Sequence, residues 1–148
     1  MAVKVADRSE SSIQFLETAR KLYAYTISTL MHFPKRIQFY ISLPISRTCT
    51  RFYTSVLKGN AINVKTKEDF IQRRQNFQDA LGELDVLEGQ INLLYSDFGA
   101  ATFTYKSTRR RIAPKAPEIW ANFVSTERRL LKGLLNKEFD KYKELYNL

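Results

Sequence analysis

The stretch "TKEDFIQRRQNFQDALGELDVLEGQINLLYSDF", residues 66–98, places an apolar side chain at every seventh position. The residues on this repeat, with the companions that widen it, are Phe70, Phe77, Ala80, Leu81, Leu84, Leu87, Ile91, Leu94 and Phe98. Seven residues make nearly two turns of an α-helix, so these side chains share one face. Thr66 stands just before Glu68 and Asp69, which is typical of a helix N-cap. The pattern predicts a helix over 66–97 that packs into a bundle.

Three more amphipathic helices are expected around it, over residues 10–32, 42–60 and 117–146. Their predicted inner faces are Leu16, Ala19, Tyr23, Ile27 and Leu30 in the first, Ile45, Cys49, Phe52 and Val56 in the second, and Trp120, Phe123, Leu130 and Leu134 in the last. Pro34 breaks the chain after the first helix, and Pro44 is tolerated in the first turn of the second. Four helices with mostly short connections predict an all-α fold, an antiparallel up-and-down four-helix bundle that forms one domain over 1–148.

Length and composition limit the possible classes of protein. The chain has 148 residues, enough to bury one core, and its hydrophobic share of 44% is that of a globular protein. It contains no run of eighteen apolar residues, so we expect no membrane span. The first residues lack the apolar segment of a signal peptide, and a single cysteine excludes an internal disulfide. We therefore expect a cytoplasmic protein.

The net charge of +9 is unevenly distributed along the chain. Residues 33–67 hold seven basic side chains and no acidic one, whereas residues 68–97 hold two basic and seven acidic ones. Residues 98–117 hold five basic and no acidic side chains. Segregation of this kind creates a directed electric field, although solvated lysines that only keep a protein soluble give the same counts.

The last of these blocks falls in a long basic loop that we expect between the third and fourth helices, over residues 99–117. Its basic residues are Lys106, Arg109, Arg110, Arg111 and Lys115. Phe103 and Tyr105 are interleaved with them. Arginine forms bidentate contacts with phosphate, and aromatic rings stack on exposed bases, so the loop is a candidate nucleic-acid contact.

Enzyme chemistry finds little support in the sequence. His32 is the only histidine, which excludes a histidine-rich metal site. Cys49 falls on the apolar face of its predicted helix and is interpreted as a small core thiol. No two glycines have the spacing of a phosphate-binding loop, and Glu83 and Glu88 do not share a helix face. We therefore expect a non-catalytic protein without a metal or cofactor.

Three segments in this order, "FPKRIQF", "RTCTRFYTSVLKGNAI" and "RRQNFQDALGELDVLEGQINLL", resemble the bacterial four-helix bundle family. That family includes proteins encoded in intervening sequences of large-subunit ribosomal RNA genes and the accessory variability determinant of diversity-generating retroelements. The positions that carry the resemblance are Phe33, Pro34, Lys35, Arg36, Phe39, Gly59, Asn60, Arg73, Arg74, Gln75, Gln78, Ala80 and Leu81. Gln38 and Pro44 depart from the family pattern.

The resemblance implies a basic homo-oligomer, a pentamer, that binds RNA or DNA and a reverse transcriptase. Phe39, Ile45 and Phe52 would hold the segment around the second helix in the bundle. The outward-facing candidates for nucleic-acid binding there are Lys35, Arg36, Arg47, Arg51 and Lys58. The apolar residues expected beside the inner stripes, and hence between subunits, are Tyr53, Leu57, Tyr95 and Leu131. The alternative function is that of a protein–protein adaptor that docks on an acidic partner surface.

Overall fold

Four helices form the fold of the protein, whose computed structural model describes residues 2–100 and 116–148, with side chains from residue 13 onward. The helices are α1 (Ala2–Met31), α2 (Leu43–Ala61), α3 (Lys67–Ser96) and α4 (Ala116–Tyr142). A 3-10 turn, η1 (Lys35–Ile37), and a π-helical turn, η2 (Gln38–Ser42), join α1 to α2. The described residues contain no strand, so the prediction of an all-α four-helix fold is confirmed.

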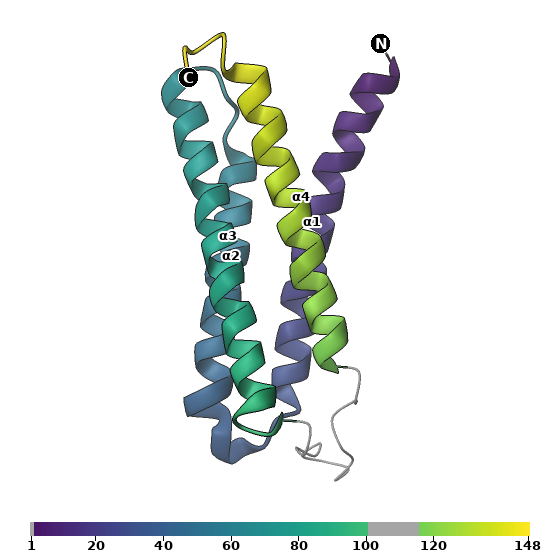
Figure 1. Ribbon diagram of the computed structural model, residues 1–148, viewed down its shortest axis with the longest axis vertical. Coiled ribbons are helices and arrows are strands. Elements are labelled where there is room, and N and C mark those ends of the chain that lie inside the picture. Colours follow the sequence, from purple (N-terminus) through teal and green to yellow (C-terminus); the bar gives the residue numbers. More distant parts are fainter. Residues whose placement is uncertain (1, 101–115) are drawn as a thin grey trace.

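The helices follow one another around the bundle. Each runs in the direction opposite to the one before it, and the α1–α2 connection lies at the end of the bundle away from the C-terminus (Figure 1). Helix α2 makes its most extensive contact with α3, and α4 packs against both α3 and α1. Helices α2 and α4 are therefore diagonal to each other, with their outer faces on different sides of the molecule.

Helix α3 confirms most of the pattern in the sequence. The Thr66 hydroxyl accepts a hydrogen bond from the backbone N–H of Asp69, and the Asp69 carboxylate accepts one from the N–H of Thr66, which is a capping box. The residues buried along this helix are Phe70, Phe77, Ala80, Leu84, Leu87, Ile91 and Leu94. The prediction that Phe98 extends the inner stripe is wrong: the helix ends at Ser96, and Phe98 is half exposed.

The inner faces of α1 and α4 differ from those predicted, whereas the predicted face of α2 is buried throughout. The buried residues are Phe15, Ala19, Leu22, Thr26, Thr29 and Leu30 in α1 and Ala116, Trp120, Val124, Glu127, Leu131 and Leu135 in α4. Leu131 thus lies in the core, which corrects its expected place between subunits. The cause of the error is that Thr26 and Glu127 are part of the core stripes, and a search for apolar residues passes over polar ones.

The polar groups of the core are of two kinds. Thr26 is satisfied: its hydroxyl donates to the Leu22 carbonyl oxygen at 2.8 Å and accepts from the Trp120 indole N–H at 2.8 Å. Glu127 is fully buried, and neither of its carboxylate oxygens has a hydrogen-bond partner in the part of the chain that the structure describes. Loss of water around it raises its pKa to about 9, so the side chain is a neutral acid at pH 7. Cys49 is a buried thiol, as predicted, and burial raises its pKa to about 11.

Candidate nucleic-acid interface

The α1–α2 corner, residues 32–42, exposes basic side chains because two of its apolar residues anchor the segment and fix its orientation. Phe33 is completely buried, and Ile37 is partly buried and packs against the core. Lys35 and Arg36 lie on η1 between these two anchors, and both are exposed. Neither forms an ion pair with any residue that the structure describes. These two predicted contacts are therefore available to a ligand.

Two aromatic residues project from the same corner. Phe39 is 79% exposed and Tyr40 is 86% exposed, the highest values among the large hydrophobic residues whose side chains the structure describes. The expectation that Phe39 holds the segment in the bundle is therefore wrong. The physical reason is the π-helical turn, in which the Leu43 N–H donates to the Gln38 carbonyl oxygen five residues back. The wider turn buries Ser42 and directs Phe39 and Tyr40 to the surface.

Helix α2 continues the basic surface away from the corner. Arg47, Arg51 and Lys58 are exposed, and at 3.6 residues per turn their positions fall within about 40° around the helix axis. The rise per residue spaces Arg47 and Lys58 by about 16 Å along the axis. Within the described part of the chain, Arg47 and Lys58 have no ion-pair partner. Together with Lys35 and Arg36, these side chains form what we call the α2 basic surface.

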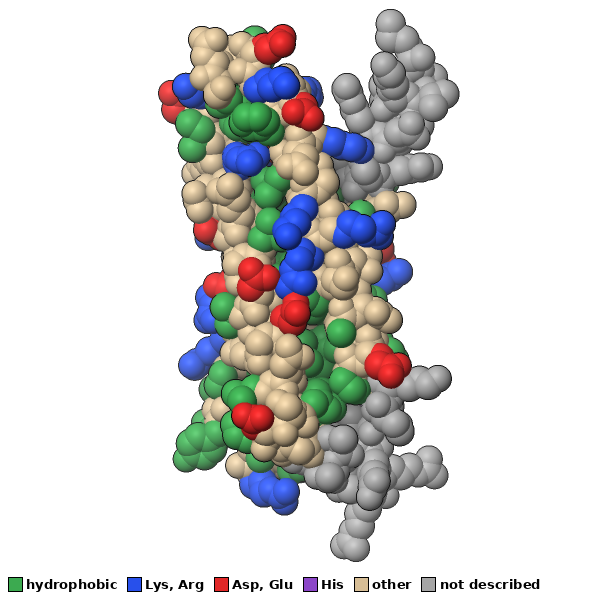
Figure 2. All heavy atoms as spheres, in the orientation of Figure 1, with side chains coloured by type: hydrophobic (Ala, Val, Ile, Leu, Met, Phe, Trp, Pro, Cys, Tyr) green, Lys and Arg blue, Asp and Glu red, His purple; other side chains and the backbone are tan. Residues whose placement is uncertain are grey.

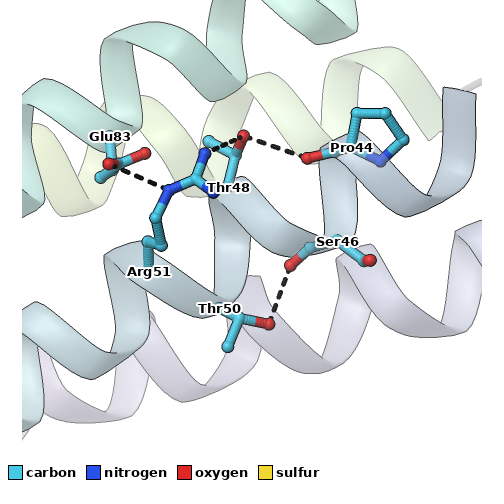
Figure 3. A network of polar contacts seen from close by, with 6 residues as sticks. All are labelled: Pro44, Ser46, Thr48, Thr50, Arg51 and Glu83. Atoms are coloured by element: carbon cyan, nitrogen blue, oxygen red, sulfur yellow. Dashed lines mark hydrogen bonds and ion pairs between the residues drawn. The ribbon is translucent and has the colours of Figure 1, made fainter.

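Arg51 differs from the others because it is held in place (Figure 3). Its Nε donates to a Glu83 carboxylate oxygen of α3 at 3.3 Å, and its Nη2 donates to the Thr48 hydroxyl at 3.2 Å. The Thr48 hydroxyl in turn donates to the Pro44 carbonyl oxygen at 3.1 Å. The pair with Glu83 is solvent-exposed and hence weak, so phosphate can compete for the guanidinium.

Five predicted site residues lie outside the described part of the chain: Lys106, Arg109, Arg110, Arg111 and Lys115. Their contribution to a nucleic-acid contact remains a prediction from the sequence.

Two arginines of the resemblance have a structural role instead. Arg73 donates from Nη1 to the carbonyl oxygens of Gly59 at 2.9 Å and Ile62 at 3.1 Å, and from Nε to Glu138 at 2.7 Å. We call these four residues the Arg73 cluster. It closes the end of α2 opposite the corner and ties α2 and α3 to α4. Arg74 similarly donates to the Leu135 carbonyl oxygen at 3.1 Å.

A row of basic residues on α4 escaped the sequence analysis. Arg129, Lys132 and Lys137 are exposed, and no ion pair to them occurs among the described residues. Figure 2 shows Lys and Arg side chains gathered over this helix, with acidic side chains close by. The acidic residues of the helix bring its net charge near zero, which hid the row. A signal was available in the spacing of Arg129 and Lys132, which places them on one face.

Other kinds of site find no counterpart in the residues that the structure describes. No group of three or more histidine, cysteine, aspartate or glutamate side chains there is placed to hold a metal ion. None of the described helices combines the length and the apolar character that crossing a membrane requires. Comparisons of the chain with protein-family models, with curated proteins and with solved structures found no match.

Proposed function

We propose that the protein is a non-catalytic, basic, oligomeric accessory protein that binds RNA or DNA through the α2 basic surface. The observation that carries the proposal is that Lys35, Arg36, Arg47 and Lys58 are all exposed without an ion-pair partner among the described residues. They come from residues 33–67, which contain no acidic residue. Cations in this state release counterions from a phosphate backbone when they bind it.

The contacts expected from such a surface are with phosphates rather than with base edges. Lysine and arginine side chains on one exposed helical face offer charge and bidentate hydrogen bonds, which position a nucleic acid without reading its sequence. Binding should therefore tolerate many sequences. It should also weaken steeply with salt, because neutralising about five phosphates gives a log–log slope of about −3.5 to −4.5.

The experiment measures the affinity for RNA and DNA oligonucleotides between low and moderate salt. Replacing Arg47 and Arg51 by alanine should make the slope shallower by about one to two units. The matched control replaces Arg129 and Lys132 on α4, where we expect the slope to stay within about half a unit of the native value. An unchanged slope in the α2 variant with a shallower one in the control would place the interface on α4. No binding at all at low salt would favour the adaptor function.

The accessory role and the oligomer rest on the resemblance to the bacterial four-helix bundle family, which suggests a pentamer and a reverse transcriptase as partner. One structural feature is consistent with contact between copies: Val86 and Leu93 are apolar and exposed on α3. On the same face Gly82 and Gly89 leave open space where another helix can approach. Light scattering that gave a monomer across micromolar concentrations would remove this part of the proposal.

A further inference from the structure

We infer that the α1–α2 corner is a site for single-stranded nucleic acid, in which unpaired bases stack on Phe39 and Tyr40 while Lys35 and Arg36 hold the flanking phosphates. This inference rests on the proposed function and specifies the form of nucleic acid that the same surface prefers. The two aromatic side chains are the starting point, because neither forms a ring contact or a side-chain hydrogen bond with the residues that the structure describes. Both are more than three-quarters exposed.

Adjacent exposed aromatic residues with flanking cations are the components of a stacking platform. A base stacked on an aromatic side chain contributes about 1–3 kcal/mol, and every base offers the required flat face. Figure 2 shows hydrophobic side chains projecting at the lower end of the molecule, where Figure 1 places the α1–α2 connection, with a basic side chain next to them. Lys35 and Arg36 lie three to five residues before the aromatic pair, so phosphate and base contacts are adjacent.

A shallow groove beside the platform adds a polar contact. It has a volume of about 240 Å³ and lies between the end of α1 and the π-helical turn, with apolar walls that include Leu30, Met31 and Leu43. Ser42 also lines it and is 5% exposed, and its hydroxyl has no hydrogen-bond partner among the described residues. Drug-sized ligands occupy pockets of about 300–1,000 Å³, so this groove suits a single ring system. A base edge would supply the partner that the Ser42 hydroxyl lacks.

The form of the ligand follows from which bases are accessible. In a duplex the base faces are covered by their neighbours, so exposed aromatic side chains have nothing to stack on. In a single strand the faces are free, and loops and unpaired ends are recognised through them. Phe39 and Tyr40 therefore favour a single strand, whereas the phosphate contacts of Arg47 and Lys58 are common to both forms.

An anionic membrane offers the same phosphate chemistry, and an aromatic corner can insert into one. The arrangement of the cations argues against it. Arg47 and Lys58 continue the basic surface along α2, parallel to the long axis of the bundle, and Lys58 lies about 24 Å beyond the end of the corner. A flat membrane touched by the corner would not reach Lys58, whereas a flexible strand can follow the helix.

The experiment compares a (dT) oligonucleotide with a duplex of equal length at fixed low salt, for the native protein and F39A/Y40A. Stacking of two bases predicts at least a tenfold loss of single-strand affinity in the variant and less than a twofold change for the duplex. S42A should lose about threefold for the single strand. The matched control is L145A, another exposed apolar residue, for which no change is expected. Circular dichroism should show all variants folded, since S42A deletes one hydroxyl and the other side chains are exposed.

The outcomes separate the two proposals. Equal losses for both ligands, or no loss for the single strand, would overturn the inference and leave the proposed function standing. Failure of the native protein to bind either ligand would overturn both. Binding of F39A/Y40A to single strands as tightly as the native protein, together with loss of binding to phosphatidylserine vesicles, would assign the corner to a membrane surface instead.

Discussion

The Arg73 cluster and the α1–α2 corner lie at opposite ends of the bundle and use the same kind of residue in different ways. At the first end Arg73 and Glu138 are 14% and 13% exposed, and the guanidinium is shared among α2, α3 and α4. At the second end Lys35 and Arg36 are exposed and contact no acidic residue that the structure describes.

A basic motif in the sequence therefore does not by itself indicate a binding site. Arg73, Lys35 and Arg36 are all among the positions on which the resemblance proposed from the sequence rests. Arg73 closes a helix end, where it satisfies carbonyl groups that the helix leaves unpaired. Lys35 and Arg36 leave their charge available. Burial, rather than residue type, decides whether an arginine stabilises this fold or binds a ligand.

The largest expected effect comes from breaking the Arg73 cluster. Replacing Arg73 by alanine removes the guanidinium donor of the Glu138 carboxylate and of the Ile62 carbonyl oxygen in a poorly hydrated place, whereas the Gly59 carbonyl oxygen keeps the Ile62 N–H. The free energy of unfolding should fall by about 3–5 kcal/mol. R47A is the matched control, because Arg47 is exposed, and it should change stability by less than about 0.5 kcal/mol. Urea denaturation measures both. Similar small losses in the two variants would remove the distinction between the ends.

The second-largest effect is a pH dependence of stability caused by Glu127, which lies in the centre of the bundle between the two ends. The folded protein binds the Glu127 proton up to about pH 9, whereas the unfolded chain releases it near pH 4.5. The unfolding free energy should therefore fall by about 1.4 kcal/mol per pH unit between these values, or about 3 kcal/mol from pH 6 to 8. In E127Q this dependence should vanish, and the variant should be the more stable protein at pH 8. Parallel pH profiles for the two proteins would show that Glu127 is ionised or solvated in the fold.

Replacing glycines by alanine should have a smaller effect on stability, with opposite signs at a packed and at an open position. A Cβ added at Gly59, in the Arg73 cluster, would lie 2.7 Å from Phe77 Cε1, whereas one added at Gly133 of α4 would meet nothing within 4 Å. G59A should therefore cost about 1–3 kcal/mol through overpacking. G133A should stabilise the protein by up to about 1 kcal/mol, because alanine favours the helix. Thermal denaturation of the two variants should shift the midpoint in opposite directions, and a shift in the same direction would contradict this packing.

The sequence predicted those parts of the fold in which the pattern was unbroken. Helix α3 and the inner face of α2 could be predicted because apolar residues occupy nearly all their buried positions. In α1 and α4 the true stripes pass through Thr26 and Glu127. The place of Thr26 in the core depends on the hydrogen bond from the Trp120 indole, a contact between distant residues that no local pattern contains.

The candidate site was predictable in its charge and not in its aromatic part. Lys35, Arg36, Arg47 and Lys58 could be predicted because the segment lacks acidic residues. The exposure of Phe39 was not predicted, because an aromatic residue in a largely apolar segment was assigned to the core although six residues, about 120° on a regular helix, separate it from Ile45. A single wider turn changes the side on which it lies, and such a turn leaves no simple signal in sequence.

The most direct test of the α2 basic surface is a chemical footprint of the lysines with a (dT) oligonucleotide at saturation. Acetylation rates, read by mass spectrometry, report which ammonium groups the nucleic acid covers. We predict that Lys35 and Lys58 are protected severalfold, while Lys132 and Lys137 on the diagonal helix α4 react as in the free protein. Protection confined to Lys132 and Lys137, or equal reactivity at all four with the oligonucleotide bound, would contradict this prediction.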